Sequence, residues 1–310
     1  MKKTIKIATR ASKLALWQAE YVALLLQNSG FQTELVPMET KGDKILNRSL
    51  SKIGSKGVFT EELEEKLRTG EVEIAVHSAK DLQATLPSDL QLIAFTKREK
   101  VNDVVVSFDK NFGFEKGKII GTSSVRRVAF LKHYYPDIQV VDMRGNLQTR
   151  LSKLERGDCH ALILAYAGVH RMGCNDLIVR ELPINKFIPA VGQGSIAVEA
   201  SINLDKIVLN KIKEAINHQE TENCLLAERT FLKTLQGGCS IPAFAHCYPI
   251  GIQKFKIEGG VIHPKGEPFV YQSFEFNQED AEKIGKLLAT NVLSHGGEAI
   301  LKEIKKSETE

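Results

Sequence analysis

Features typical of membrane-bound and secreted proteins are missing from this sequence. No run among its 310 residues is long and apolar enough to cross a bilayer. The basic N-terminus passes directly into a strand pattern, without the apolar core and cleavage site of a signal peptide. The five cysteines are an odd number at irregular spacings, which argues against a disulfide framework and for a reducing compartment. We therefore expect a cytoplasmic protein with no membrane partner.

The usual signatures of metal and nucleotide sites are also missing. No CxxC or Cys/His pattern has zinc-ligand spacing, so no metal site is predicted. There is neither a glycine-rich P-loop followed by Lys-Ser/Thr nor a GxGxxG motif. The net charge of 42 − 38 = +4 is too small to require a nucleic acid, and the aromatic residues, at 7%, are not interleaved with basic ones. No nucleic-acid partner is expected.

The order of strand and helix patterns predicts an α/β protein. Residues 3–38 form a strand–helix–strand opening, and a second unit of this kind begins at residues 118–141. A polar loop, 39–57, lies between them, and loops of this length are uncommon unless they are functional or mobile. From residue 217 onward a helix, three strand patterns and two further helices predict a small α+β domain.

Arginine recurs where predicted strands end or predicted helices begin, at Arg10, Arg126, Arg127, Arg144, Arg150 and Arg171. Guanidinium groups match carboxylates and phosphates, and helix N-termini add N–H donors. The run Thr122-Ser123-Ser124 before the arginine pair is the sharpest single anion site. Any one of these arginines could instead be solvated or paired with a nearby acid, because surface ion pairs are common and weak. Six at equivalent positions indicate a ligand with several negative charges, and a small or oligomeric carboxylate fits best.

Asp81 lies among basic residues at the carboxyl end of a short buried-type strand, 74–77, where ligands bind in open α/β sheets. A carboxylate there could stabilise a developing cation or move a proton. The alternative is a helix N-cap aspartate, which is the more frequent role for this spacing. His77, on the same strand, is expected to be a hydrogen-bonded core histidine.

A glycine pair precedes Cys239, after a helical pattern over 220–235 and before Pro242. This arrangement predicts a thiol on a tight loop just past a helix, although a glycine pair can also simply end a helix. The other cysteines are expected to be packing residues, and they are Cys159, Cys174, Cys224 and Cys247.

The ordered motifs resemble those of the porphobilinogen deaminase family over essentially the whole chain. The motifs are Thr9-Arg10-Ala11-Ser12, Gly57-Val58-Phe59, His77-Ser78-Ala79-Lys80-Asp81, Gly121-Thr122-Ser123-Ser124-Val125-Arg126-Arg127, Arg144-Gly145-Asn146, Pro189-Ala190-Val191-Gly192-Gln193-Gly194, Ala227-Glu228-Arg229 and Gly237-Gly238-Cys239. The resemblance implies two doubly wound α/β lobes like those of periplasmic binding proteins, plus a small C-terminal α+β domain. It places domain 1 at residues 1–96 and 195–216, domain 2 at 97–194 and domain 3 at 217–310.

The resemblance also implies the activity. Family members are transferases that join four porphobilinogen molecules head to tail, with release of ammonia, into the linear tetrapyrrole hydroxymethylbilane. A dipyrromethane cofactor, held through a thioether to the family's cysteine, here Cys239, serves as primer, and Asp81 takes the place of the catalytic aspartate. A monomer that passes its product to uroporphyrinogen-III synthase is expected. The competing hypothesis is a two-lobed carboxylate-binding protein without chemistry, which would need neither Asp81 nor an exposed Cys239.

Further site residues follow from the resemblance by position. It implies cofactor contacts from Ser78, Lys80, Thr122, Ser123, Ser124, Arg126, Arg127, Arg144, Gly145 and Arg150. It implies substrate contacts from Arg10, Ser12, Arg171 and Gln193, and from Lys52, Lys56 and Phe59 near the loop that would cover the cleft. Departures from the family pattern occur at Ala79, Gln83, His170 and Phe244, and none of them removes a charged catalytic group.

Overall fold

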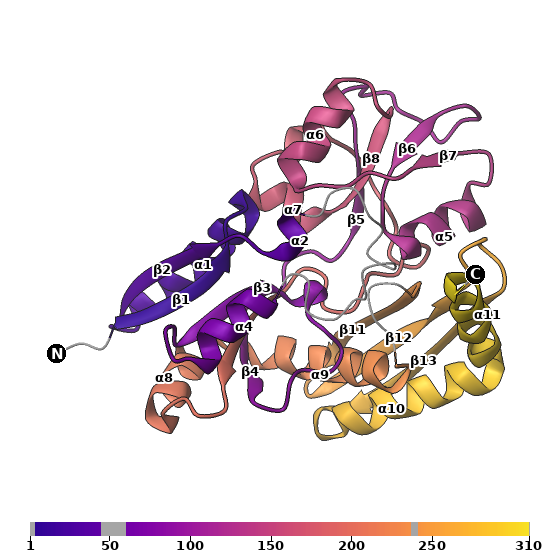
Figure 1. The fold of residues 1–310 in the computed structure, drawn as a ribbon. Helices are drawn as coiled ribbons and strands as arrows, with labels where there is room; N and C mark the ends of the chain where they lie inside the picture. Colours follow the sequence, from indigo (N-terminus) through magenta and orange to yellow (C-terminus); the bar gives the residue numbers. More distant parts are fainter. Residues whose placement is uncertain (1–3, 45–59, 237–240, 310) are drawn as a thin grey trace.

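The computed structural model describes residues 4–44, 60–236 and 241–309, which build three sheets and their covering helices (Figure 1). Two sheets have five strands each and the third has three. The α/β class and the small C-terminal α+β unit predicted from the sequence are confirmed. Among the described residues, no helix is long and apolar enough to span a membrane.

The first sheet has the strand order β2-β1-β3-β10-β4 and, with its helices, forms what we call lobe 1. Its strands are β1 (Thr4–Arg10), β2 (Gln32–Met38), β3 (Ile74–Ser78), β4 (Leu90–Phe95) and β10 (Ile196–Ser201). Its helices are α1 (Lys13–Asn28), α2 (Lys41–Lys44), α4 (Glu61–Arg68) and α8 (Lys206–Ile216). β1 pairs in parallel with β2 and β3, whereas β10 runs antiparallel to β3 and β4. The carboxyl ends of β1 and β3 therefore lie at one edge, where Arg10 and Ser78 end their strands.

The second sheet repeats this plan in the order β7-β6-β8-β5-β9 and forms lobe 2. Its strands are β5 (Asp103–Val106), β6 (Ile119–Gly121), β7 (Gln139–Val141), β8 (Ala161–Ala165) and β9 (Ile178–Glu181). Its helices are α5 (Val125–Tyr134), α6 (Leu147–Glu155) and α7 (Tyr166–Arg171). The edge strand β9 was not predicted from the sequence, because it is short and its last two residues are exposed and charged.

The third sheet is an antiparallel meander followed by two helices, as predicted. Its strands are β11 (Ala243–Gly251), β12 (Lys254–Ile262) and β13 (Phe269–Asn277), and its helices are α9 (Gln219–Thr234), α10 (Ala281–Val292) and α11 (Glu298–Thr309). Phe244 explains one departure from the family pattern. Its ring centroid lies 5.2 Å from that of Phe130 on α5, so the bulky side chain fills the junction between this sheet and lobe 2.

Helix α9 anchors both chain segments that cross between the lobes. The buried carboxylate of Glu228 accepts a hydrogen bond from Arg98 Nη1 at 2.6 Å and another from the backbone N–H of Gly192 at 2.8 Å. Arg98 belongs to the first crossing and Gly192 to the second. One buried residue thus binds both crossing segments, and in Figure 1 α9 lies below lobe 2.

Candidate active site

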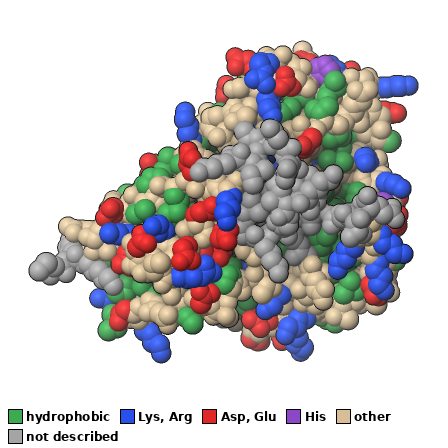
Figure 2. Space-filling view, in the orientation of Figure 1, with side chains coloured by type: hydrophobic (Ala, Val, Ile, Leu, Met, Phe, Trp, Pro, Cys, Tyr) green, Lys and Arg blue, Asp and Glu red, His purple; other side chains and the backbone are tan. Residues whose placement is uncertain are grey.

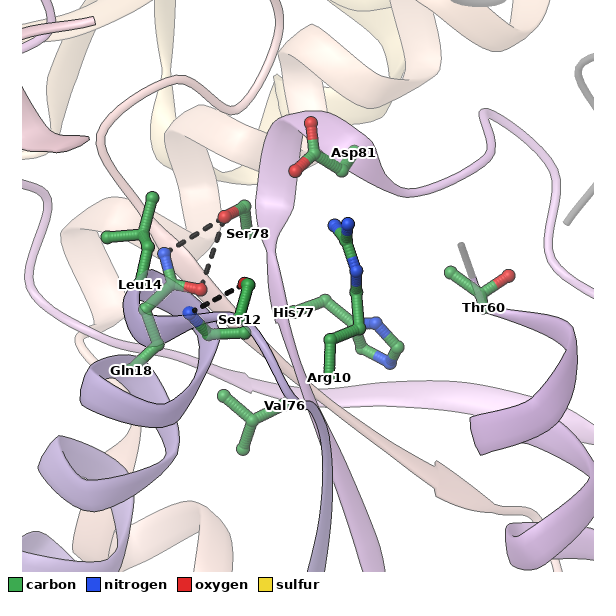
Figure 3. Close-up of a pocket in the computed structure, with 10 residues that line it drawn as sticks. Arg10, Ser12, Leu14, Gln18, Thr60, Val76, His77, Ser78 and Asp81 are labelled. Carbon is green, nitrogen blue, oxygen red and sulfur yellow. Dashed lines mark hydrogen bonds between the residues drawn. The ribbon is translucent and has the colours of Figure 1, made fainter. Parts of the chain in front are cut away.

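The carboxyl edge of the lobe 1 sheet carries a cavity of about 60 Å³ (Figure 3). Its lining residues are Arg10, Ser12, Leu14, Ala15, Gln18, Thr60, Val76, His77, Ser78 and Asp81. Arg10, Ser12, Ser78 and Asp81, which the resemblance implies as site residues, thus line one cavity although they follow two separate strands. Figure 3 shows the Arg10 side chain extending toward the Asp81 carboxyl group.

Asp81 ends a short 3₁₀ turn, Ala79–Asp81, that follows β3 directly. The next residue, Leu82, has an extended backbone with ψ of 146°, so no helix begins at Asp81. The alternative interpretation of Asp81 as a helix N-cap is therefore wrong. The Asp81 side chain is exposed toward the cavity, and His77 below it is buried, with Nε2 3.1 Å from Glu199 Oε2. That contact confirms His77 as a hydrogen-bonded core histidine.

Gln18 is a cavity residue that was not predicted as part of the site. It projects from α1, where its Nε2 donates to Ser78 Oγ at 2.9 Å and its Oε1 accepts from Ser78 Oγ at 3.2 Å. The first bond uses a hydrogen of the amide and the second uses the hydrogen of the hydroxyl, so Gln18 holds Ser78 both as acceptor and as donor. Ser12 Oγ accepts from the N–H of Ala15 at 3.4 Å and caps α1. The signal available in the sequence was that Gln18 lies on the predicted helix one to two turns from Ser12.

Arg126 and Arg127, on α5, lie inside lobe 2 rather than on an open surface. Asp103, at the start of β5, accepts from Arg126 Nη2 at 2.8 Å and from Arg127 Nη2 at 2.7 Å. Gln193 also donates to Asp103, at 2.9 Å. All four side chains are almost fully buried. Asp103 is therefore a site residue that the sequence analysis missed. The sequence does show a single acidic residue directly before the apolar run 104–106, which could have indicated it.

Donor atoms of the two arginines remain available after these contacts. Arg126 Nη1 donates to the carbonyl of Ile188 at 2.7 Å, and Arg127 Nη1 donates to that of Ile163 at 2.9 Å. The Nε atoms of both arginines are buried and have no hydrogen-bond partner among the described residues. Each Nη atom carries a second N–H beyond the bonds named above, so the arginine pair keeps donors for a ligand that supplies acceptors.

Lys80 and Arg150 add two more positive groups. Burial lowers the pKa of Lys80 to about 8, and the nearby charge of Arg127 lowers it in the same direction. Burial likewise lowers the pKa of Arg150 to about 10, again with a contribution from Arg127. Asp81 opposes both shifts, which places its carboxylate near each cation. We call Lys80, Arg126, Arg127 and Arg150 the cation cluster. These four cations outnumber the acids that act on them among the described residues, which are Asp81, Asp103 and Asp142.

The side-chain hydroxyls of Thr122, Ser123 and Ser124, directly before α5, are arranged so that each can donate a hydrogen bond. Thr122 Oγ1 accepts from the N–H of Ser124, Ser123 Oγ from that of Met143 and Ser124 Oγ from that of Arg127, at 3.3, 3.1 and 3.5 Å. A hydroxyl that accepts from a backbone N–H keeps its own hydrogen for another acceptor. The three hydroxyls therefore suit an anion, as predicted from the sequence.

The other predicted residues of lobe 2 have defined partners. Gly145 has φ of +112°, and a side chain there would come within 2.6 Å of Thr149, so only glycine fits. Its carbonyl accepts from Arg150 Nε at 2.8 Å. Arg144 donates to Asp142 at 3.2 Å. Arg171 donates to the carbonyl of Gly194 at 2.8 Å.

Four predicted residues lie outside the described residues: Cys239, Lys52, Lys56 and Phe59. The other four cysteines are described and free; Cys159, Cys224 and Cys247 are buried and Cys174 is partly exposed. The outer surface of lobe 1 carries interspersed acidic and basic side chains on the face shown in Figure 2, with no continuous basic area. The cation cluster brings Lys80 of lobe 1 close to arginines of lobe 2.

Replacing Asp103 with asparagine is expected to lower the free energy of unfolding by about 3–5 kcal/mol, because both buried guanidinium groups lose their counter-charge. Burial raises the pKa of Asp103, but the charges of Arg126 and Arg127 outweigh it and hold the pKa well below its usual value. The carboxylate therefore stabilises the fold above the unfolded-state pKa of about 4, and this stabilisation is lost as the pH falls toward the folded-state pKa.

Urea denaturation of both proteins checks this expectation. The difference between wild type and Asp103→Asn should be constant above about pH 5 and shrink below about pH 4. A difference under about 1 kcal/mol at pH 7, the size of an exposed ion pair, would show that Asp103 does not organise the arginine pair.

Comparison with known proteins places these observations in a family context. Two family models match, "Porphobilinogen deaminase, dipyromethane cofactor binding domain" over residues 5–208 and "Porphobilinogen deaminase, C-terminal domain" over residues 222–294. The chain is 50% identical to a porphobilinogen deaminase of Cytophaga hutchinsonii, over 99% of this chain and 98% of that protein. It is 49% identical to one of Desulfosudis oleivorans, over 98% and 99%. A solved structure of the methionine-binding protein MetQ aligns with a TM-score of 0.44 and 12% identity, over 68% of this chain and 89% of that one.

Proposed function

Because this chain belongs to the porphobilinogen deaminase family, we propose that the cleft between lobes 1 and 2 is its active site and that Asp81 is its catalytic residue. The chain is a transferase of tetrapyrrole biosynthesis that polymerises porphobilinogen, and its cofactor is dipyrromethane. Bound in the cleft, the cofactor supplies the primer to which substrate units are added. The competing hypothesis of a carboxylate-binding protein without chemistry is set aside, since it does not account for membership of an enzyme family.

One observation supports the assignment of the site most strongly. The positively charged side chains of the cation cluster lie together and outnumber the acidic side chains near them. The cation cluster has four members, and within the described part of the chain the acids that act on Lys80, Arg126 and Arg150 are three: Asp81, Asp103 and Asp142. Each pyrrole unit of substrate and cofactor carries an acetate and a propionate. Carboxylates in this place would compensate the positive charge and accept from the N–H groups that the arginine Nη atoms still carry.

The residues of lobe 2 are proposed to hold the cofactor. The hydroxyls of Thr122, Ser123 and Ser124 have protons to donate, and Arg150 is fixed by the carbonyl of Gly145. Asp103 is proposed to fix the planes of the two α5 guanidinium groups and so to set the direction of their remaining donors. Cys239 is proposed as the point of covalent attachment.

The residues of lobe 1 are proposed to bind the incoming substrate and to carry the chemistry. Loss of ammonia from porphobilinogen leaves a cation on the substrate. The Asp81 carboxylate would stabilise that charge through the pyrrole N–H, and it can accept the proton that must leave once the new carbon–carbon bond has formed. Arg10, which extends toward Asp81, would bind a substrate carboxylate and place the pyrrole beside it.

Several finer assignments belong to this proposal. We infer domains at residues 1–96 with 195–216, at 97–194 and at 217–310. The sheets support these limits, because β10 at 196–201 joins the lobe 1 sheet after the chain has completed lobe 2. A cytoplasmic monomer that releases its product to uroporphyrinogen-III synthase is proposed from the family, and the four free cysteines suit a reducing compartment.

The reactivity of Lys80 tests whether carboxylates of the cofactor lie in the cation cluster. Only the neutral amine is acylated, so Lys80, with its pKa lowered to about 8, should label with a midpoint near that pH in cofactor-free Cys239→Ser protein. A carboxylate beside the amine favours its charged form, so in cofactor-loaded protein the midpoint should rise by about one pH unit or more. Pulse acetylation followed by peptide mass spectrometry measures both, with the exposed Lys233 as internal reference. Equal midpoints in the two proteins would reject the site.

A further inference from the structure

Helix α9 packs against the turn that carries Asp81. Leu225 is fully buried and belongs to one apolar cluster with Ala79 and Leu82, the residues on either side of the turn's polar tip. One helical turn further on, Arg229 Nη2 donates to the backbone carbonyl of Gln83 at 2.8 Å. The same helix therefore contacts the catalytic turn twice, once with an apolar and once with a charged side chain.

Arg229 is a partly buried arginine whose one described hydrogen bond goes to that carbonyl. Burial lowers the pKa of Arg229 to about 10, and the carboxylate of Glu199 acts against this shift, so the side chain stays charged at neutral pH. Glu199 also contacts His77 Nε2 at 3.1 Å. Glu199 thus touches the strand that enters the turn, while Arg229 holds the segment that leaves it.

The orientation of the Asp81 side chain depends on these contacts from α9. Among the described residues, none forms a hydrogen bond with the Asp81 carboxylate. Its direction is therefore set by the backbone of the three-residue turn Ala79–Asp81, and the backbone immediately after the turn is the part that Arg229 holds. A catalytic group must be kept within a fraction of an ångström of its working position, which requires supporting contacts of this kind.

We propose that Arg229 is a positioning residue for the reaction: it holds the carbonyl of Gln83 so that the turn presents Asp81 to the substrate. The inference rests on the proposed catalytic role of Asp81. It also gives the C-terminal domain a part in the chemistry beyond carrying the cofactor, because Arg229 lies on α9, the helix that precedes the proposed attachment residue Cys239 in the chain.

Arg229→Met is the first test, since methionine keeps the length of the side chain and removes its charge and its donors. We expect kcat to fall about 10- to 100-fold, the range for a small displacement of a catalytic group, with KM within about twofold of wild type. Arg229→Lys keeps a charged donor and should recover part of the loss. Lys233→Met removes an exposed positive charge from the same helix and should leave kcat unchanged.

Cofactor occupancy, read from the intact mass, verifies that each variant is folded and loaded. A fully loaded Arg229→Met protein with kcat within twofold of wild type overturns the proposal. So does an Arg229→Lys protein no better than Arg229→Met. A loss that appears only in KM would assign Arg229 to substrate binding and would likewise overturn it.

A double variant separates this inference from the proposal for Asp81. If Arg229 acts through Asp81, adding Arg229→Met to Asp81→Asn should change the residual rate of the first porphobilinogen addition by less than about twofold. A full additional loss in the Asp81→Asn background would show that Arg229 acts independently of Asp81, and the positioning role would be wrong. Near-normal turnover of Asp81→Asn alone would instead reject the catalytic role of Asp81.

Discussion

Asp81→Ala protein is expected to keep its dipyrromethane and to lose porphobilinogen turnover by about a thousandfold or more. The Asp81 carboxylate has two proposed roles: it stabilises a developing cation and it accepts a proton. Each such role typically increases the reaction rate by a factor of about 10²–10⁴. Asp81 has the exposure and the position for both roles, at the end of a turn that faces the cavity. Ammonia release at saturating porphobilinogen measures the loss, and the intact mass reports the cofactor.

Two further variants make the Asp81 result specific. Asp81→Asn preserves the shape of the side chain and removes its charge, so it should be about as inactive as Asp81→Ala. Asp81→Glu keeps the charge but moves it by one methylene and should retain more activity than either. Near-normal ammonia release from Asp81→Ala, with the cofactor in place, would reject the role given to this residue.

Cys239→Ser protein is expected to contain no covalent cofactor and to have no measurable turnover. A thioether requires the sulfur, and a serine hydroxyl is a far weaker nucleophile unless an adjacent base activates it. Without a tethered primer, the cleft would have to retain a growing chain through its cation cluster alone. The measurement is colour development with a pyrrole aldehyde reagent, together with ammonia release.

Cys174→Ser is the matched control, because Cys174 is the one described cysteine that is partly exposed rather than buried. It should colour and turn over like wild type. Colour bound to Cys239→Ser protein after denaturation and gel filtration would show that another residue carries the cofactor.

The parts of the site that could be predicted from the sequence are those set by local chain order. Arg10 ends one strand, Asp81 follows another, and the hydroxyl run precedes a helix, so each position follows from one strand–helix junction. Parallel pairing then brings the strand ends to one edge of their sheet. This logic needs no knowledge of long-range contacts.

The contacts that the sequence did not indicate join distant segments. Asp103 pairs with arginines 23 and 24 residues away, and Arg229 reaches a carbonyl 146 residues away. Arg126 and Arg127 were predicted as ligand contacts from their charge, and their burial around Asp103 could be seen only in the structure. Charge can be read from residue type, whereas burial depends on what the rest of the chain packs against it.

A primer-carrying polymerase and a receptor for carboxylates differ most clearly in whether a pyrrole chain is attached covalently to the protein. The intact mass of the purified active protein tests this difference directly. We predict a single species heavier than the polypeptide by two linked pyrrole units, with the added mass located on the peptide that contains Cys239. An active protein whose mass equals that of the bare polypeptide, with a free thiol at Cys239, would contradict the account.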